Sequence, residues 1–492
     1  MKSMKTFLLV LVGLMSMPMA AGAYETDVEV DGVRYAINTT TKTAAVVSNS
    51  YTGDVVIRPS VTYDYDGTVC SVTSIGNYAF DYCSGLTSVS IPSSVTSIGE
   101  AAFRYCSNLA SANIPSSVTS IGLAAFRGCN KLTEVSIPGG VKSIGNEAFS
   151  DCSGLTSLTI GRGVETIGES AFYNCSKLTS LNIPNTVTSM GDGAFKSCSG
   201  LTSVSIPSSL TSLAPRVFMS CTSLTSVIIP SSVTSIGTEA FFNCTNLSSI
   251  TIPSSVTNID SYAFRSSGLT SIEIPGSVPR IGNYTFDCCS KLTTVKISNG
   301  VTSIGNHAFD NCEALNSVSI PNSMTTIGDF AFSWCMNINS FRVDIDTPIS
   351  ISDNVFIFYN ATLYVPEGSK ALYQAAQPWS RFEAIEEYPV KKCATPTISY
   401  ANGKVRFACE TEGVKFVPTA KCLPKQTQNG NELELGGTYD ISVIATKEGY
   451  RDSQVASKTF DLNQMGDMDG DGEVSVTDVT SLVNVILGKV TI

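Results

Sequence analysis

The last thirty residues contain the strongest chemical motif of the chain, the acidic stretch GDMDGDGEVSVTD. In a 12-residue calcium loop, oxygen ligands stand at positions 1, 3, 5, 7, 9 and 12, and a glycine stands at position 6. Gly472 takes the glycine position, and the six ligand positions fall on Asp467, Asp469, Asp471, the carbonyl of Glu473, Ser475 and Asp478. Because the carboxylates would repel one another without a cation, we expect calcium to be the cofactor of this segment.

A short amphipathic helix is expected directly after this loop, in VTDVTSLVNVILG, with its apolar residues on one face. The aspartate at position 12 and the lack of a helix before the loop make residues 463–492 resemble a type I dockerin repeat rather than an EF-hand. Dockerins carry two such repeats, whereas this sequence shows one. The resemblance implies calcium binding and a cohesin-like partner. The alternative is a calcium-clamped terminal cap or an export and anchoring element.

The composition argues against catalysis and against nucleic acid as a partner. The chain has 492 residues, a net charge of −11 and a single histidine, His307. One histidine leaves no room for a multi-histidine metal site, and a negative chain is repelled by phosphates. The acidic residues are scattered along the chain and no segment is typical of a catalytic domain, so we expect a protein that is not an enzyme.

The N-terminus has the features of an export signal, residues 1–23. Lys2 and Lys5 precede the apolar run FLLVLVGLM, and the small residues AAGA end at Ala23. The apolar run is shorter than the roughly 20 residues that a membrane anchor needs. We therefore expect cleavage before Tyr24, a secreted or cell-surface protein, and no membrane span.

A repeat of 23 residues dominates the rest of the chain. Each copy follows the pattern LTSVSIPSSVTSIGxxAFxxC, and one step of 22 residues interrupts the series. Its phenylalanines are Phe80, Phe103, Phe126, Phe149, Phe172, Phe195, Phe218, Phe241, Phe264, Phe286, Phe309 and Phe332. Registered copies of one unit that cannot bury its own apolar face indicate a solenoid of about 12 turns.

Each segment of the repeat has an expected conformation. The segment LTSVSI is rich in β-branched residues and predicts one strand per turn, which Pro92 and its equivalents end. Ala102, Phe103 and Cys106 lie at i, i+1 and i+4, which predicts a short helical turn that points the ring and the thiol inward. The fold class that follows is an α/β solenoid with a parallel sheet on one face.

The repeat is similar to the leucine-rich repeats of the bacterial BspA-like family, which share the Leu-x-x-Val-x-Ile-Pro and Ile-Gly-x-x-Ala-Phe-x-x-Cys layout. The resemblance covers residues 61–343, with an N-terminal cap in residues 24–60 and a C-terminal cap in residues 344–390. It implies a secreted or surface protein, in some members an adhesin, that binds a host or microbial protein or glycan through the concave sheet.

The outward positions of the expected sheet are mostly hydroxyls, and the exceptions are candidate partner-binding residues. In the position before the last isoleucine of each strand, the residues that break the hydroxyl surface are Ile228, Glu273, Lys296 and Arg342. Exposed apolar or charged side chains on a rigid scaffold are where recognition concentrates. The alternative is that Glu273 and Lys296 only form a weak ion pair between neighbouring strands.

Eleven of the 16 cysteines occupy one repeat position, where we expect free thiols that fill the core. Among the others, Cys393 and Cys409 are the pair most suited to a disulfide in an exported protein. Both lie within residues 391–462. In this segment, short stretches of alternating apolar and polar residues, separated by Asn-Gly and Gly-Gly, predict a small β-sandwich. This segment resembles the immunoglobulin-like or fibronectin-III-like spacer modules of exported bacterial proteins.

Overall fold

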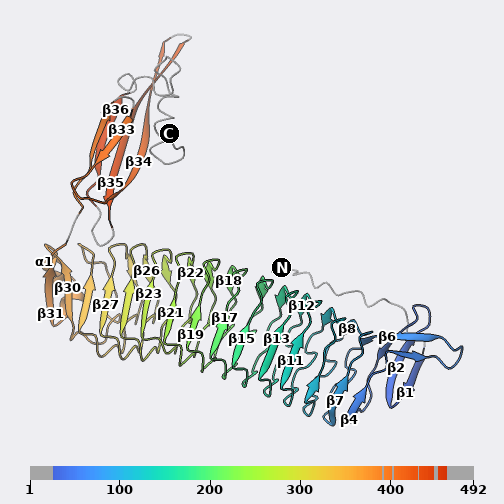
Figure 1. Cartoon of the computed structure of the whole chain (residues 1–492). Coiled ribbons are helices and arrows are strands. Elements are labelled where there is room, and N and C mark those ends of the chain that lie inside the picture. The colour runs from blue at the N-terminus through green and yellow to red at the C-terminus, as the bar shows by residue number, and fades with distance from the viewer. Residues whose placement is uncertain (1–25, 391–392, 402–403, 430–431, 448–452, 462–492) are drawn as a thin grey trace, which may run out of the picture. The chain divides into compact units, whose positions relative to one another are not determined.

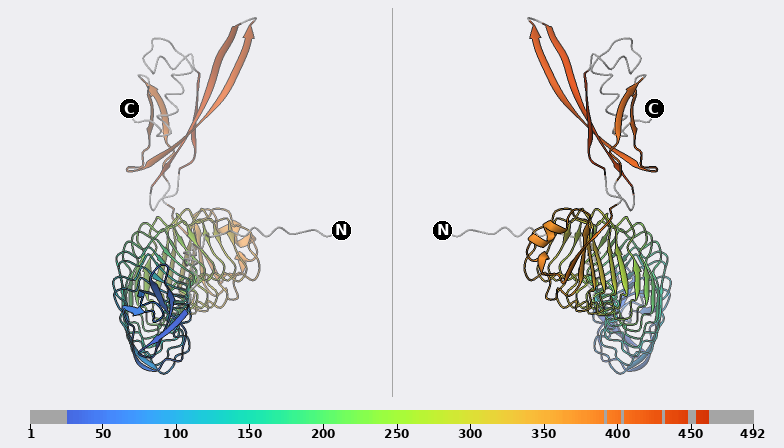
Figure 2. Two further views of the ribbon diagram at one scale, coloured as in Figure 1. Left: turned by 90° about the vertical axis from the view of Figure 1, so that its right-hand side faces the viewer. Right: turned by 90° about the vertical axis from the view of Figure 1, so that its left-hand side faces the viewer.

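The computed structural model describes residues 26–390, 393–401, 404–429, 432–447 and 453–461 (Figure 1). The chain divides into two compact units, residues 1–386 and 387–492. The first unit is a solenoid of turns stacked side by side, and Figure 2 looks nearly along that stack. The second unit is a small set of antiparallel strands.

The first parallel sheet of the solenoid is built from the LTSVSI segments and their equivalents. Within residues 26–390 it has 14 strands, against the 12 turns expected from the repeat count, and its backbone pairing is interrupted after the third, the fifth and the ninth strand. Its strands are β4 (Gly53–Val56), β7 (Leu86–Ser90), β9 (Ser111–Ala112), β11 (Glu134–Ile137), β13 (Ser157–Ile160), β15 (Ser180–Asn182), β17 (Ser203–Ser205), β19 (Ser226–Ile228), β21 (Ser249–Thr251), β23 (Ser271–Ile274), β25 (Thr294–Ile297), β27 (Ser317–Ile320), β29 (Ser340–Val343) and β30 (Thr362–Pro366).

A second parallel sheet corrects the prediction of one strand per turn. It is formed by the Ser-Ile pair that precedes the repeat glycine, and its strands pair in register with the equivalent residues one turn away, with one break between Ser189–Met190 and Ser212–Leu213. Its strands are β6 (Val69–Ile75), β8 (Ser97–Ile98), β10 (Ser120–Ile121), β12 (Ser143–Ile144), β14 (Thr166–Ile167), β16 (Ser189–Met190), β18 (Ser212–Leu213), β20 (Ser235–Ile236), β22 (Asn258–Ile259), β24 (Arg280–Ile281), β26 (Ser303–Ile304) and β28 (Thr326–Ile327).

The segment expected to be a helical turn has no helix, which corrects the α part of the fold class. Ala101 and Tyr105 have positive φ angles of 49° and 56°, and a right-handed helix has no such residues. The N–H groups of Ala101, Phe103 and Tyr105 donate to carbonyls of the following turn at 2.6–2.8 Å. Alternate residues therefore form hydrogen bonds to the next turn of the solenoid. In an α-helix, the same N–H groups would bond to carbonyls four residues earlier in their own segment.

The core runs through all turns without interruption. Each turn contributes the leucine, valine and isoleucine positions of both sheets together with the phenylalanine and the cysteine, and these side chains are buried. The phenylalanine rings stack from Phe80 to Phe332 and on to Phe356, with neighbouring ring centroids 4.8–6.0 Å apart. Aromatic stacking between every pair of turns adds to the area buried by the aliphatic side chains.

The two caps differ in how they cover the ends. At the N-terminus, β1 (Thr26–Val30), β2 (Val33–Asn38) and β3 (Thr43–Val46) extend the second sheet, and β5 (Ser60–Thr62) pairs with β6. At the C-terminus, α1 (Lys370–Ala375) and the 3-10 turn η1 (Trp379–Arg381) precede β31 (Ala384–Tyr388), which pairs with β30. Because β4 and β30 belong to the first sheet, the stack of turns reaches beyond the predicted limits of 61 and 343.

The second unit contains two antiparallel groups of strands. One pairs β32 (Thr397–Ala401) with β33 (Lys404–Ala408), and the other has the order β34 (Lys415–Asn429), β35 (Glu432–Thr446), β36 (Ala456–Asp461). An all-β unit was expected, but β34 and β35 have 15 residues each and form one long hairpin. The predicted Gly-Gly turn is wrong, because Gly436 and Gly437 lie inside β35, opposite Lys425 and Pro424.

No helix within the described ranges has the length and apolar character required to cross a lipid bilayer.

Candidate binding surfaces

The outer face of the first sheet is a regular array of hydroxyl groups. Ser203, Ser226 and Ser249 lie opposite one another in register and are exposed. In the column beside them, threonine hydroxyls donate to the threonine carbonyl of the preceding turn, as Thr225 does to Thr202 at 3.2 Å. The neighbouring strands of such a sheet lie about 4.8 Å apart, so the hydroxyl groups are evenly spaced along the stack.

The predicted partner-binding residues all lie on this face. Ile228 is 83% exposed, between Ser205 and Thr251 in the register of β17, β19 and β21. It is the most exposed apolar side chain of the first sheet's described strands. An isolated isoleucine in a hydroxyl surface gains nothing for the fold from its exposure, which leaves it free to contact a partner.

The charged candidates are engaged in exposed ion pairs. The Nζ atom of Lys296 lies 2.7 Å from Oε1 of Glu273, and the two residues are direct partners in the register of β23 and β25. The Nε atom of Arg342 lies 2.9 Å from Oδ1 of Asp344. The expected pairing of Glu273 with Lys296 is confirmed. Pairs this exposed contribute little stability, so a partner's charges could replace them at small cost.

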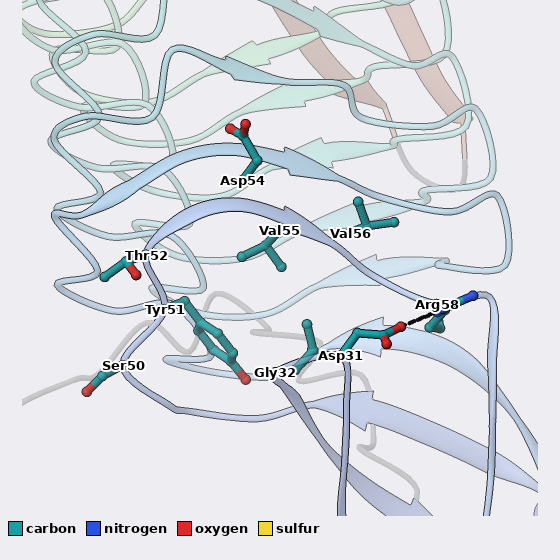
Figure 3. Close-up of a pocket in the computed structure, with 10 residues that line it drawn as sticks. Asp31, Gly32, Ser50, Tyr51, Thr52, Asp54, Val55, Val56 and Arg58 are labelled. Carbon is teal, nitrogen blue, oxygen red and sulfur yellow. Dashed lines mark hydrogen bonds and ion pairs between the residues drawn. The ribbon is translucent and has the colours of Figure 1, made fainter.

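A hollow of about 680 Å³ lies at the N-terminal end of the first sheet (Figure 3). Strand β4 forms one wall and the turn between β1 and β2 forms another. The ion pair between Asp31 and Arg58, with Nε and Oδ2 2.6 Å apart, lies at the end near Val56. Tyr51 and Val55 are buried beneath it, at 4% and 9% exposure.

Asp54 is the acidic group of this hollow with no cation beside it among the described residues. Its Oδ1 atom accepts hydrogen bonds from Oγ of Ser88 at 2.6 Å and from Oγ1 of Thr87 at 2.8 Å. These bonds, that from Ser88 first, lower the pKa of Asp54 below its ordinary value. The side chain is thus a fixed, ionised carboxylate at neutral pH.

The repeat cysteines form a ladder of buried free thiols, as predicted. From Cys106 to Cys335, the Sγ atom donates to the phenylalanine carbonyl of the preceding turn at 3.0–3.4 Å. Burial raises the pKa of Cys198 and Cys244 to about 12. The thiols are therefore neutral, and they give the phenylalanine carbonyls a second hydrogen bond beside the one from a backbone N–H of the carbonyl's own turn, as Cys83 N–H gives Phe80 at 3.0 Å.

His307 is part of the scaffold. Its ring lies between Tyr284 and Phe330, with centroid distances of 4.5 and 4.9 Å, and its Nδ1 atom lies 2.8 Å from Oδ2 of Asp310. The two stacked neighbours and the contact with Asp310 together fix the position of the ring between turns. Within the described ranges, no three histidine, cysteine, aspartate or glutamate side chains come together as a metal-binding group.

Two sequence predictions concern the C-terminal unit. The calcium ligands, from Asp467 to Asp478, lie outside the described residues, and so does the dockerin-like helix. The predicted disulfide between Cys393 and Cys409 is wrong. Cys409 is a free thiol whose Sγ atom donates to the Ala394 carbonyl at 3.0 Å, so the thiol is directed at a backbone oxygen.

Sequence reasoning missed the hollow at β4. The segment Gly53–Val56 lacks the LTSVSI pattern, so the sequence predicts that it belongs to the N-terminal cap. One signal was available: Tyr51 supplies an aromatic ring ahead of the first repeat phenylalanine, and in the structure this ring lies 4.5 Å from that of Phe80. The strand that follows Tyr51 is β4, which pairs with β7 and extends the first sheet by one turn.

The family model of the BspA type leucine rich repeat region matches residues 69–178, 165–293 and 280–368. Together these segments run from residue 69 to residue 368, which is more than half of the chain. No curated protein matches the sequence.

Solved structures of repeat proteins are similar to the chain. A leucine-rich repeat protein from Bacteroides ovatus is 26% identical, with a TM-score of 0.52, and the match covers 74% of this chain and 100% of that one. A leucine-rich cell surface protein from Faecalibacterium prausnitzii is 27% identical, with a TM-score of 0.45 and coverage of 65% and 94%. The pneumococcal vaccine antigen PcpA is 20% identical, with a TM-score of 0.46 and coverage of 74% and 99%.

Proposed function

Since this chain belongs to the family of BspA-type leucine-rich repeat proteins, we propose that it is a secreted or cell-surface binding protein of adhesin type, without enzymatic activity. Its ligand is a host or microbial protein or glycan held on the outer face of the first sheet. The observation that carries the proposal is the isolated, 83% exposed Ile228 within the array of hydroxyl groups. Export is supported by the signal-like residues 1–23.

The face suits a ligand with many weak polar contacts around one apolar anchor. Interfaces concentrate their binding energy in a few central residues, with polar contacts around them. The ion pair between Glu273 and Lys296 and that between Arg342 and Asp344 lie further along the same face. Their charges would select and orient a ligand more than they would tighten it.

The experiment is capture by the mature chain, residues 24–492, of host matrix proteins and bacterial secreted proteins. Ile228→Ser and Lys296→Glu should weaken capture. Lys142→Glu is a matched control, since Lys142 forms an equally short 2.7 Å, equally exposed pair with Glu165 beside the second sheet. Equal loss in Lys296→Glu and Lys142→Glu would refute recognition by this face.

For the tail we propose calcium binding by Asp467, Asp469, Asp471, Glu473, Ser475 and Asp478. The alternating acidic motif supports this, and the dockerin resemblance adds a cohesin-like partner in an extracellular glycan-processing assembly as the alternative function. Calorimetric titration with CaCl₂ should give one site in the mature chain and none in Asp467→Ala. Capture that is lost in Asp467→Ala or in chelator, but kept in Ile228→Ser, would indicate that the tail binds the partner and the first sheet does not.

A further inference from the structure

The N-terminal cap covers the two sheets unequally. The cap strands β1, β2 and β3 continue the second sheet, so its first turn has a strand neighbour. Among the described residues the first sheet has no such neighbour, because β4 is the terminal strand of the order β4, β7, β9. Within this part of the chain the first sheet therefore begins with an open edge, and the hollow described above lies along this edge.

The backbone of β4 presents hydrogen-bonding groups to the hollow. The N–H of Gly53 donates to Gly85 and that of Ile57 to Ser90, both on β7. Because successive N–H groups of a strand point to opposite sides, those of Asp54 and Val56 point away from β7. These groups and the intervening carbonyls are what a further strand would use.

The side chains around the edge define which strand would fit. Val55 and Tyr51 form a buried apolar floor, and Asp54 and Val56 are exposed on the other face of β4. Asp54 is held by two hydroxyl donors and faces no cation among the residues described. Arg58 does not neutralise the charge of Asp54, because Arg58 forms its ion pair with Asp31.

We propose that the hollow beside β4 binds an extended peptide segment, which adds a strand to the first sheet and places a lysine or arginine next to Asp54. The added strand would repeat the pairing that β4 makes with β7, where Asp54 lies opposite Ser88. Its backbone supplies the affinity and its basic residue the selectivity, as in other strand-addition complexes. This surface differs from the face of the proposed function, and either can fail without the other.

The probes are capped peptides with the sequence of residues 84–94, SGLTSVSIPSS, carrying either S88K or S88E. They represent the strand that β4 already accepts, with a charge at the position that faces Asp54. Binding of the fluorescein-labelled peptides to the mature chain is measured by fluorescence polarisation. The S88K peptide should bind about fivefold more tightly than the S88E peptide, and Asp54→Lys should reverse this order.

Two matched variants test the mode of binding. Val56→Pro removes the N–H that faces the hollow and should weaken the S88K peptide about tenfold, whereas Val56→Ala keeps that N–H and should not. Glu134→Lys makes the same charge change as Asp54→Lys in the same outward column, but on β11, which has further turns of the solenoid on both sides, and should have no effect. Circular dichroism checks that each variant is folded.

Three results would overturn the proposal. One is equal affinity of both peptides for the wild type and for Asp54→Lys. Another is absence of binding by either peptide at about 1 mM, the result expected if Asp54 only prevents unwanted edge pairing. The last is a wild-type dimer in sedimentation that Val56→Pro dissociates, which would make a second copy the occupant.

Discussion

Replacing Cys198 by alanine should cost less stability at pH 10 than at pH 8. The thiol is fully buried, and burial raises its pKa from 9.0 to about 12. As the pH rises above 9, the unfolded chain loses this proton while the folded chain keeps it. The free energy of unfolding therefore falls with pH between 9 and 12, since the unfolded state binds fewer protons.

The size of the effect follows from the two pKa values. One pKa unit corresponds to 1.36 kcal/mol, and pH 10 lies one unit above the pKa of the unfolded thiol. The wild type should lose about 1.4 kcal/mol through Cys198 at pH 10, and close to nothing at pH 8. The Cys198→Ala variant has no thiol to ionise and keeps its free energy of unfolding in this respect. The difference in free energy of unfolding between the wild type and the variant should therefore be about 1.4 kcal/mol smaller at pH 10 than at pH 8.

The assay is urea unfolding of the mature chain, followed by circular dichroism with a phosphine reductant at both pH values. Ionisation of tyrosines affects the wild type and the variant alike and cancels in the difference. Val187→Ala, at a buried and non-ionising site, should cost the same at pH 8 and pH 10. If Cys198→Ala also costs the same at both, burial does not keep the thiol protonated and the reasoning is refuted.

Further outcomes are expected from the core and the turns. Phe195→Ala should lower the free energy of unfolding by about 3–5 kcal/mol in urea, because the ring stacks on both neighbours and leaves a cavity. Iodoacetamide at pH 8 should label the partly exposed Cys288 and Cys409 in the native protein and the buried repeat cysteines only after unfolding, as read by intact mass. Gly163→Ala should lower the melting temperature, because its Cβ would lie 1.7 Å from the Gly139 carbonyl oxygen; an unchanged melting temperature would show that the turn can widen.

The sequence predicts the first sheet and the stacked core well. The repeat period fixes which residues are neighbours in adjacent turns, and the apolar side chains fix which positions are buried. Every copy of LTSVSI repeats its apolar positions, and a residue and its equivalent 23 positions on must face each other. The contact between Glu273 and Lys296 follows from this register alone. The same register could not show whether a partner displaces the pair.

The second sheet and the irregular turns could not be predicted for a physical reason. A two-residue strand such as Ser97–Ile98 is too short to show alternation, and its pairing exists only in the stack. Positive φ angles at Ala101 and Tyr105 are stabilised by hydrogen bonds to the next turn, which local sequence does not encode. The open edge at β4 likewise depends on where the cap strands pair.

The hydrogen bonds between turns run along the stack, from Ala101 to Leu123 and so on through the repeats. A tensile load on the two ends of the solenoid would act on these bonds one turn at a time, as in opening a zipper. Each turn that yields would release 23 residues, which extend to roughly 75 Å at ~3.3 Å per residue. A protein built this way would lengthen in steps under load while its remaining turns kept their shape.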